Sequence, residues 1–163
     1  ARSQTDQIEY QPENFDLIKQ IEEAADLLSG QAKSKDIVIQ IIDTKSTIVY
    51  ADKNCINAVL RNLISNAIKF TFNGGEVSIS VSHSNNEVIV AVADNGIGMK
   101  PEVVSKLFSI DNKHATLGTA KEKGTGLGLV LCREFIEKNK GRIWLESEHD
   151  EGSVFYFTLP EKK

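Results

Sequence analysis

The sequence predicts an α+β protein, a two-layer α/β sandwich. We expect a mixed, mostly antiparallel sheet of about five strands, covered on one face by about three helices, plus a small N-terminal strand pair. Pairs of short apolar runs with strand periodicity alternate with segments of helical periodicity. A Ser-Asn-Asn turn at residues 84–86 joins two of these runs as a hairpin. The strict strand–helix alternation of a doubly wound parallel sheet is missing.

Length and composition indicate one domain without nucleic-acid function. A chain of 163 residues buries a sizeable core, and its net charge of −4 gives no basic field for nucleic acid or anionic membranes. No apolar run reaches the roughly 18 residues that span a membrane, and no signal peptide opens the chain. Two cysteines in apolar helical patterns predict buried free thiols. We therefore expect a cytoplasmic domain.

The first third of the chain predicts a linker, a helix and two strands. Residues 1–13 are polar and aperiodic, so they read as an entry linker to a domain covering 14–163. Apolar positions spaced by three and four predict a helix from Asn14, its N-cap, to about residue 33. Runs rich in β-branched residues predict strands at 37–42 and 48–50, with a turn at 43–46.

A second helix and a hairpin are predicted next. Asp52 caps a helix that ends before the Asn-Gly-Gly of residues 73–75, and apolar residues form its buried stripe. Asn62 and Asn66 are four apart and Lys69 follows three later, so all three share one polar face. Alternating valine and isoleucine residues predict strands at 77–81 and 88–92.

The last third predicts a loop between two helices, then two strands. A short helix runs from Pro101 to Phe108. Residues 109–125 have few apolar anchors, which predicts a mobile and functional loop. A helix over 126–140 stops at Gly141, and strands follow at 142–147 and 153–159.

Two glycine-rich turns flank that loop. The first, Asp94-Asn95-Gly96-Ile97-Gly98-Met99, follows an apolar strand. The Asp94 carboxylate accepts a hydrogen bond from an adenine amino group in one interpretation, with Gly96 and Gly98 letting the backbone approach the base. An ordinary Asp-Asn-Gly turn is the alternative. Ile97 and Met99 are expected as pocket wall or core.

The second turn, residues 124–128, precedes a helix. Its backbone N–H groups and the positive helix end predict an anion site. It is neither a P-loop nor a clean dinucleotide fingerprint, because no Gly-Lys-Ser/Thr follows and no strand precedes it. On the earlier helix, the Asn66 amide oxygen is a suitable ligand for Mg²⁺. Asn62, one turn earlier, is placed to orient a water on that ion, and Lys69 to pair with a phosphate. A plain solvent-facing side of the helix is the alternative.

Four segments in chain order resemble the N, G1, F and G2 boxes of the ATP-binding catalytic domain of sensor histidine kinases. They are residues 62–70 (Asn-Leu-Ile-Ser-Asn-Ala-Ile-Lys-Phe), 94–98, Phe108 and 124–129. The terminal residues 152–160 also resemble the last strand of that domain, so the resemblance covers 14–160. It implies the GHKL family, whose nucleotide-binding architecture is the Bergerat fold.

The resemblance implies ATP and Mg²⁺ as cofactors and a role for each matching residue. Asn66 is the metal ligand, with Asn62 assisting and Lys69 on phosphate; these three are the catalytic candidates. Phe70 packs on the adenine that Asp94 reads. The remaining implied ATP-binding positions shape the base pocket, the phosphate turn and the lid: Gly96, Ile97, Gly98, Met99, Phe108, Lys121, Lys123, Gly124, Thr125, Gly126, Leu127, Gly128, Leu129 and Ser153. Lys113 is a further basic lid candidate.

Two departures from the family pattern affect the expected reaction. Hydrolysing relatives carry Glu where this chain has Asn62, and an amide cannot act as the general base. The sequence after Phe108 lacks the second Phe of many kinases. The first departure disfavours an autonomous ATPase and favours phosphoryl transfer to an incoming nucleophile.

The three histidines, His83, His114 and His149, lack the sequence context of a phosphoacceptor. The resemblance therefore implies a histidine on a separate helical dimerisation domain as one partner, and the receiver domain of a response regulator as another. We expect the isolated domain to be monomeric and the full-length kinase to be a homodimer. Three alternatives stay open: a stand-alone GHKL ATPase, an anti-sigma-type serine kinase, and an inactive nucleotide-sensing module.

Overall fold

The computed structural model describes residues 9–42, 45–106 and 128–162. Its elements in chain order are β1 (Pro12–Asp16), α2 (Leu17–Leu27), α3 (Ser29–Ser34), β2 (Val38–Ile41), β3 (Ile48–Asp52), α4 (Lys53–Phe70), β4 (Glu76–Ser84), β5 (Glu87–Asp94), α5 (Pro101–Lys106), α6 (Gly128–Lys138), β6 (Ile143–Glu148) and β7 (Gly152–Pro160).

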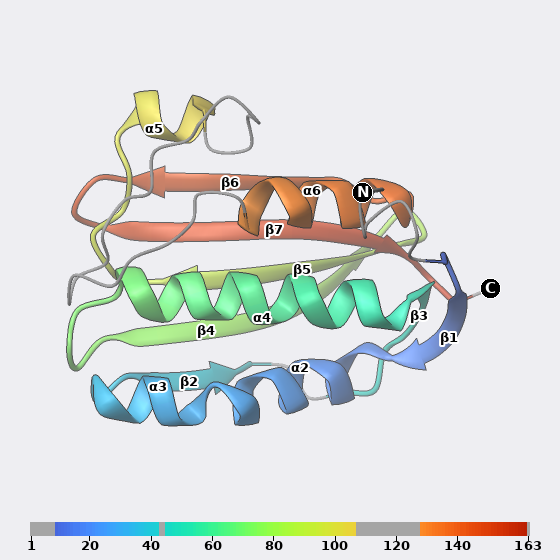
Figure 1. Ribbon diagram of the computed structural model, residues 1–163, viewed down its shortest axis with the longest axis horizontal. Helices are drawn as coiled ribbons and strands as arrows, with labels where there is room; N and C mark the ends of the chain where they lie inside the picture. The colour runs from blue at the N-terminus through green and yellow to red at the C-terminus, as the bar shows by residue number, and fades with distance from the viewer. Residues whose placement is uncertain (1–8, 43–44, 107–127, 163) are drawn as a thin grey trace, which may run out of the picture.

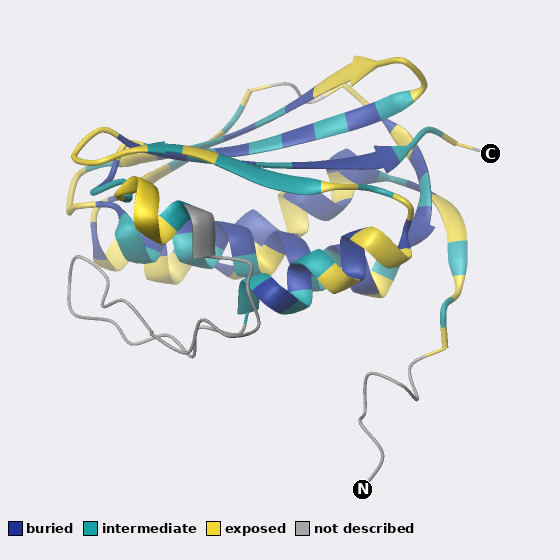
Figure 2. Ribbon diagram, turned by 90° about the horizontal axis from the view of Figure 1, so that it is seen from above, coloured by how far each residue is buried: buried dark blue, intermediate teal, exposed yellow. Residues whose placement is uncertain are grey.

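These elements form two layers (Figure 1). A five-stranded sheet has the order β2-β4-β5-β7-β6, and only the β2–β4 pair is parallel. The helices α2, α3, α4 and α6 cover one face of this sheet, as the view from above shows (Figure 2). The predicted α+β sandwich with a mixed, mostly antiparallel sheet is confirmed.

Helix α4 is central to the core. Asp52 is its N-cap, as predicted, and its carboxylate accepts from the backbone N–H groups of Asn54 and Cys55 at 3.0 and 3.2 Å. The buried stripe of α4 packs toward the sheet, where alternate residues of β4 and β5 are also buried. The β4–β5 hairpin turns through Asn85 and Asn86, both at positive φ as a type I′ turn requires. The sequence predicted this hairpin.

The predicted N-terminal helix is wrong at its start. Residues 12–16 form strand β1 instead, and Asp16, not Asn14, caps α2 by accepting from the Ile18 N–H at 3.1 Å. The helical pattern also breaks at Leu28, where α2 ends before α3 begins. The backbone of β1 gains partners only from β3, which is distant in sequence, so local periodicity carried no signal for it.

The small N-terminal strand pair is present, but its members are β1 and β3. The strands predicted at 37–42 and 48–50 do not pair with each other. The former, β2, joins the main sheet parallel to β4, and the Ile42 N–H continues that ladder by donating to the Ile79 carbonyl at 2.9 Å. In this arrangement Ile37 and Ile39 lie on the side of α2 and α3, with which they line a groove.

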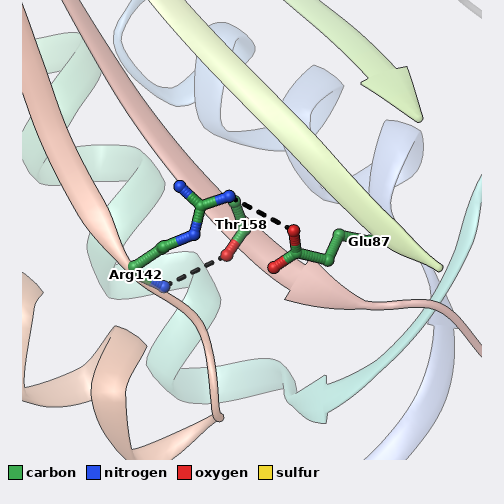
Figure 3. Close-up of polar contacts among 3 residues, drawn as sticks. All are labelled: Glu87, Arg142 and Thr158. Atoms are coloured by element: carbon green, nitrogen blue, oxygen red, sulfur yellow. Dashed lines mark hydrogen bonds and ion pairs between the residues drawn. The ribbon is translucent and has the colours of Figure 1, made fainter. Parts of the chain in front are cut away.

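Side chains tie the sheet together beyond β5. The Arg142 backbone N–H donates to Thr158 Oγ1 at 3.1 Å, and its guanidinium donates to Glu87 at 3.2 Å (Figure 3). Thr158 is fully buried. Helix α6 ends at Lys138, and the left-handed residue that follows is Lys140 (φ 65°), whereas Gly141 donates to the Ile136 carbonyl at 2.9 Å. The stop that we assigned to Gly141 therefore spans both residues.

Both cysteines are buried and free, as predicted. Burial raises the pKa of the Cys132 thiol to about 12, so this thiol is inert. Within the three described stretches, no helix has the length and apolar character to cross a membrane.

Candidate functional site

The first glycine turn lies against the C-terminal end of α4. The Ile97 N–H donates to the Phe70 carbonyl at 3.0 Å. A Cβ atom at position 96 would lie 1.9 Å from that same carbonyl oxygen, so only glycine allows this approach. Residues 94–97 are thereby fixed one helical turn from Asn66, which is four residues before Phe70.

The other end of the turn is held by the β6–β7 connection. The Met99 N–H donates to Ser147 Oγ at 2.8 Å, and the Asp150 N–H donates to the Ile97 carbonyl at 2.6 Å. Gly98 has φ +66°, and a side chain there would meet the Glu148 carbonyl. The turn is therefore clamped between α4 and β6–β7.

Asp94 ends β5 with its carboxylate in this clamp. The carboxylate accepts from the Gly96 N–H at 2.9 Å. Burial raises the pKa of Asp94 to about 6, while hydrogen bonds from the backbone N–H groups of Gly96 and Ser153 act to lower it. Ser153 sits opposite Asp94 in the antiparallel β5–β7 pair. A half-buried carboxylate acceptor therefore lies opposite a serine.

The predicted polar face of α4 exists and is half-buried. Asn62, Asn66 and Lys69 are all of intermediate exposure. The Lys69 ammonium lies 5.0 Å from the centre of the Phe70 ring. The structure brings Lys69 and Phe70 to the end of α4 that holds the glycine turn, and Asn66 lies one turn earlier.

Asn62 is in contact with the start of α6. Its Nδ2 donates to the Ala58 carbonyl at 3.3 Å within α4. A Cβ atom added at Gly128 would lie only 2.6 Å from the Asn62 Oδ1 atom. The amide therefore turns its oxygen, not its nitrogen, toward the N-terminus of α6, where the second glycine-rich segment ends.

The side-chain oxygens that could bind a metal ion at this site are uncharged amide oxygens. In the described part of the chain, no group of three His, Cys, Asp or Glu side chains could hold a metal ion. Asn62 and Asn66 are four residues apart on one face of α4, and Asn62 directs its amide oxygen toward the start of α6. Such a set fits Mg²⁺ that keeps several waters and shares phosphate oxygens, because this ion rarely takes an all-protein cage.

Several predicted site residues lie outside the described residues. They are Phe108, Lys113, Lys121, Lys123, Gly124, Thr125, Gly126 and Leu127. The expectation of a mobile loop over 109–125 falls on the same residues. Leu129 lies within α6 and packs against the core.

Two residues with a part in the site were missed from the sequence. Lys35 is buried, and its ammonium donates to the Ile68 and Lys69 carbonyls at 3.0 and 3.2 Å, which caps the end of α4. Ser147 holds the Met99 end of the glycine turn. Both roles arise from tertiary contacts, so only a residue type unusual for its element, such as a buried lysine, would have signalled them.

A hollow of about 280 Å³ adjoins Asn62 on the outer side of α4, lined by Leu28, Ala58, Arg61, Asn62 and Ser65. A larger groove of about 580 Å³ runs between α2–α3 and β2 and contains none of the predicted site residues. Of the predicted site residues, only Asn62 lines the smaller hollow.

Comparison with known proteins agrees with this geometry. Residues 51–163 match the family described as "Histidine kinase-, DNA gyrase B-, and HSP90-like ATPase". The adaptive-response sensory kinase SasA of Rippkaea orientalis is 44% identical over 114 residues, which are 69% of this chain and 28% of that protein. The chain spans between 28% and 41% of the length of the first curated relatives it matches.

Solved structures give the same result. The catalytic domain of histidine kinase ThkA superposes with a TM-score of 0.79 at 32% identity, covering 95% of this chain and 97% of that domain. The structure of ThkA in complex with the response regulator TrrA matches with a TM-score of 0.77 at 29% identity, covering 94% of this chain and 42% of that one.

Proposed function

The chain belongs to the family of histidine kinase-, DNA gyrase B- and HSP90-like ATPases, and we propose that it is the ATP-binding catalytic domain of a two-component sensor histidine kinase. It transfers the γ-phosphoryl group of ATP to a histidine that lies outside this chain. The observation that carries the proposal is the docking of the Asp94 turn on Phe70, one helical turn from Asn66.

The base site consists of the clamped turn and its neighbours. Asp94 accepts from the adenine amino group, and Gly96 and Gly98 let the turn pack against the Phe70 and Glu148 carbonyls, which shapes the base pocket. Ile97 and Met99 form the wall, while Phe70 packs on the ring. A carboxylate fixed by the Gly96 N–H needs no reorganisation when the base arrives, which favours tight and selective binding.

The phosphate site lies between α4 and the start of α6. Asn66 would hold Mg²⁺ through its amide oxygen with Asn62 assisting, and the bound ion would neutralise charge on the phosphates. Lys69 contacts phosphate as a point charge. Gly128 begins a helix whose N-terminus favours anions, and Lys121 and Lys123 with residues 124–127 complete the phosphate turn. These groups hold the triphosphate for in-line attack.

The nucleophile comes from another domain. His83 is exposed and lies 3.5 Å from Glu161, and His149 lies 3.4 Å from Asp150 in the β6–β7 turn, so neither has a helical acceptor setting. Asn62 cannot remove a proton from water, which disfavours hydrolysis. The acceptor histidine lies on a helical dimerisation and phosphoacceptor domain of the same kinase. That kinase is a homodimer with the chain in the cytosol, and it passes phosphate to a response regulator.

The test is autophosphorylation of the parent kinase with γ-labelled ATP. We expect acid-labile, base-stable phosphohistidine in the native kinase and its loss in Asn66→Ala. The control Asn54→Ala alters an exposed asparagine at the other end of α4 and should retain labelling. Phosphoserine in place of phosphohistidine would favour the anti-sigma-type serine kinase. ATP hydrolysis by the chain alone would favour the stand-alone ATPase. Absence of nucleotide binding would favour the inactive nucleotide-sensing module. Each of these results contradicts the proposal.

A further inference from the structure

Ser147 lies at a junction of three segments of the candidate base pocket. Its hydroxyl oxygen accepts from the Met99 N–H at 2.8 Å. It also lies 3.1 Å from the Gly152 carbonyl and 2.7 Å from the Ser153 hydroxyl. None of the roles proposed above involves Ser147, yet it contacts both the end of the glycine turn and Ser153, the residue opposite Asp94.

The proton positions in this network follow from the partners. A serine hydroxyl has one proton and two lone pairs. The Gly152 carbonyl can only accept, so the Ser147 proton is used in that bond. Either oxygen could be the donor in the 2.7 Å contact between the two hydroxyls, and with the Ser147 proton on the Gly152 carbonyl this contact uses the proton of Ser153. Ser147 accepts twice and donates once, and its bonding capacity is filled.

Because the Ser153 proton is used in the bond to Ser147, the Ser153 hydroxyl can only accept further hydrogen bonds. Ser153 is 4% exposed and stands directly opposite Asp94, with both side chains on the helix-covered face of the sheet. Directly opposed residues in such a pair have Cβ atoms about 4.5–5.5 Å apart. Two groups that act as acceptors therefore lie side by side, and both favour a base edge that carries an amino group.

We propose that Ser147 is a specificity-positioning residue: by taking the Ser153 proton, it keeps Ser153 an acceptor beside Asp94 and makes the pocket reject a purine with a 6-carbonyl. This inference rests on the proposed nucleotide-binding function. Adenine presents a 6-amino donor, which both acceptors can receive. Hypoxanthine replaces the 6-amino group by a carbonyl and carries a hydrogen on N1, where adenine has a bare nitrogen, so its 6-oxygen would face two acceptors with no donor.

The test compares the affinities of the chain for Mg-ADP and Mg-IDP by calorimetry. In the native chain we expect ADP to bind at least about a hundredfold more tightly than IDP. In Ser147→Ala, the Ser153 hydroxyl is released to donate to the 6-carbonyl, and the preference should fall about fivefold to tenfold. Ser147→Thr retains a hydroxyl and should keep the native preference. Ser82→Ala alters an exposed serine of β4 and serves as the matched control.

A double-mutant cycle separates positioning from general structural damage. If Ser147 acts through Ser153, adding Ser147→Ala to Ser153→Ala should leave the ADP/IDP ratio unchanged. The same ratio change in both backgrounds, or an unchanged ratio in Ser147→Ala, would overturn the inference. Should Ser147→Ala fail to fold, the native preference remains decisive, because equal binding of ADP and IDP refutes an acceptor-only pocket. A native chain that binds neither nucleotide would instead refute the proposed function.

Discussion

Asn62 Oδ1 and the Cα of Gly128 are so close that a methyl group on Gly128 would lie 2.6 Å from the amide oxygen. The two residues belong to different helices, and the contact joins the polar face of α4 to the start of α6. Phe70 and Ile97 make a comparable junction at the other end of α4. The first glycine turn and Gly128 therefore both contact α4, as the proposed nucleotide site requires.

Gly128→Ala should weaken Mg-nucleotide binding. The new methyl group pushes the Asn62 oxygen out of place, and we expect at least about a tenfold loss of affinity, since misplacing a polar group costs about 1.4 kcal/mol or more. Calorimetry with Mg-ADP measures it. Gly30→Ala is the matched control, because a Cβ there meets nothing within 4 Å. An unaltered affinity in Gly128→Ala would remove Asn62 from the site.

Asp94→Asn should stabilise the empty domain above about pH 6. Burial raises the pKa of Asp94 to about 6, so the native state binds the proton more tightly than the unfolded state does. The stability from this group is complete below its ordinary pKa and is lost as the pH rises through about 6. Urea unfolding should show a gain of about 1–2 kcal/mol for Asp94→Asn at pH 7.5 and little gain near pH 4. A gain independent of pH would contradict the burial of a charged carboxylate.

Nucleotide affinity of the native chain should rise with pH through about 6. The carboxylate is a stronger acceptor for the adenine amino group than the protonated acid, so binding favours the charged form of Asp94. Titrations of Mg-ADP at several pH values measure the effect. In Asp94→Asn the affinity for Mg-ADP should be lower and should not change with pH across this range. A profile that stays steep in Asp94→Asn would assign the titration to another group.

Lys35→Met should destabilise the domain by removing the cap at the end of α4. The ammonium donates to two carbonyls at that end, and its loss removes both of these hydrogen bonds, one of them buried. We expect about 1–3 kcal/mol, measured as a lower urea midpoint with an unchanged slope. Lys33→Met, which changes an exposed lysine of α3, is the matched control and should have little effect. Equal effects of the two substitutions would show that the cap contributes nothing.

The sequence was informative where the signal is local. The Asp52 cap, the stripe of α4 and the Asn85–Asn86 turn follow from side-chain spacing and turn chemistry, and all three are present. Strand β1 and the partner of β2 depend on pairing with distant segments, which periodicity cannot report.

The candidate site follows the same rule. Asp94, Gly96 and Gly98 stand out as a motif, and the structure brings them to the end of α4 beside Phe70. Ser147 and Lys35 look like an ordinary strand serine and a surface lysine. Their partners come from the glycine turn and from α4, so only the folded chain reveals what they hold.

The most direct test of the central claim is calorimetric titration of the native chain with ADP, with and without Mg²⁺, alongside Asn66→Ala and Asp94→Asn. If α4 and the Asp94 turn form one site, the native chain binds ADP in a Mg²⁺-dependent manner. Asn66→Ala then loses the Mg²⁺ dependence, and Asp94→Asn loses affinity with or without the ion. Binding that is unchanged in both variants, or absent from the native chain, would contradict the account.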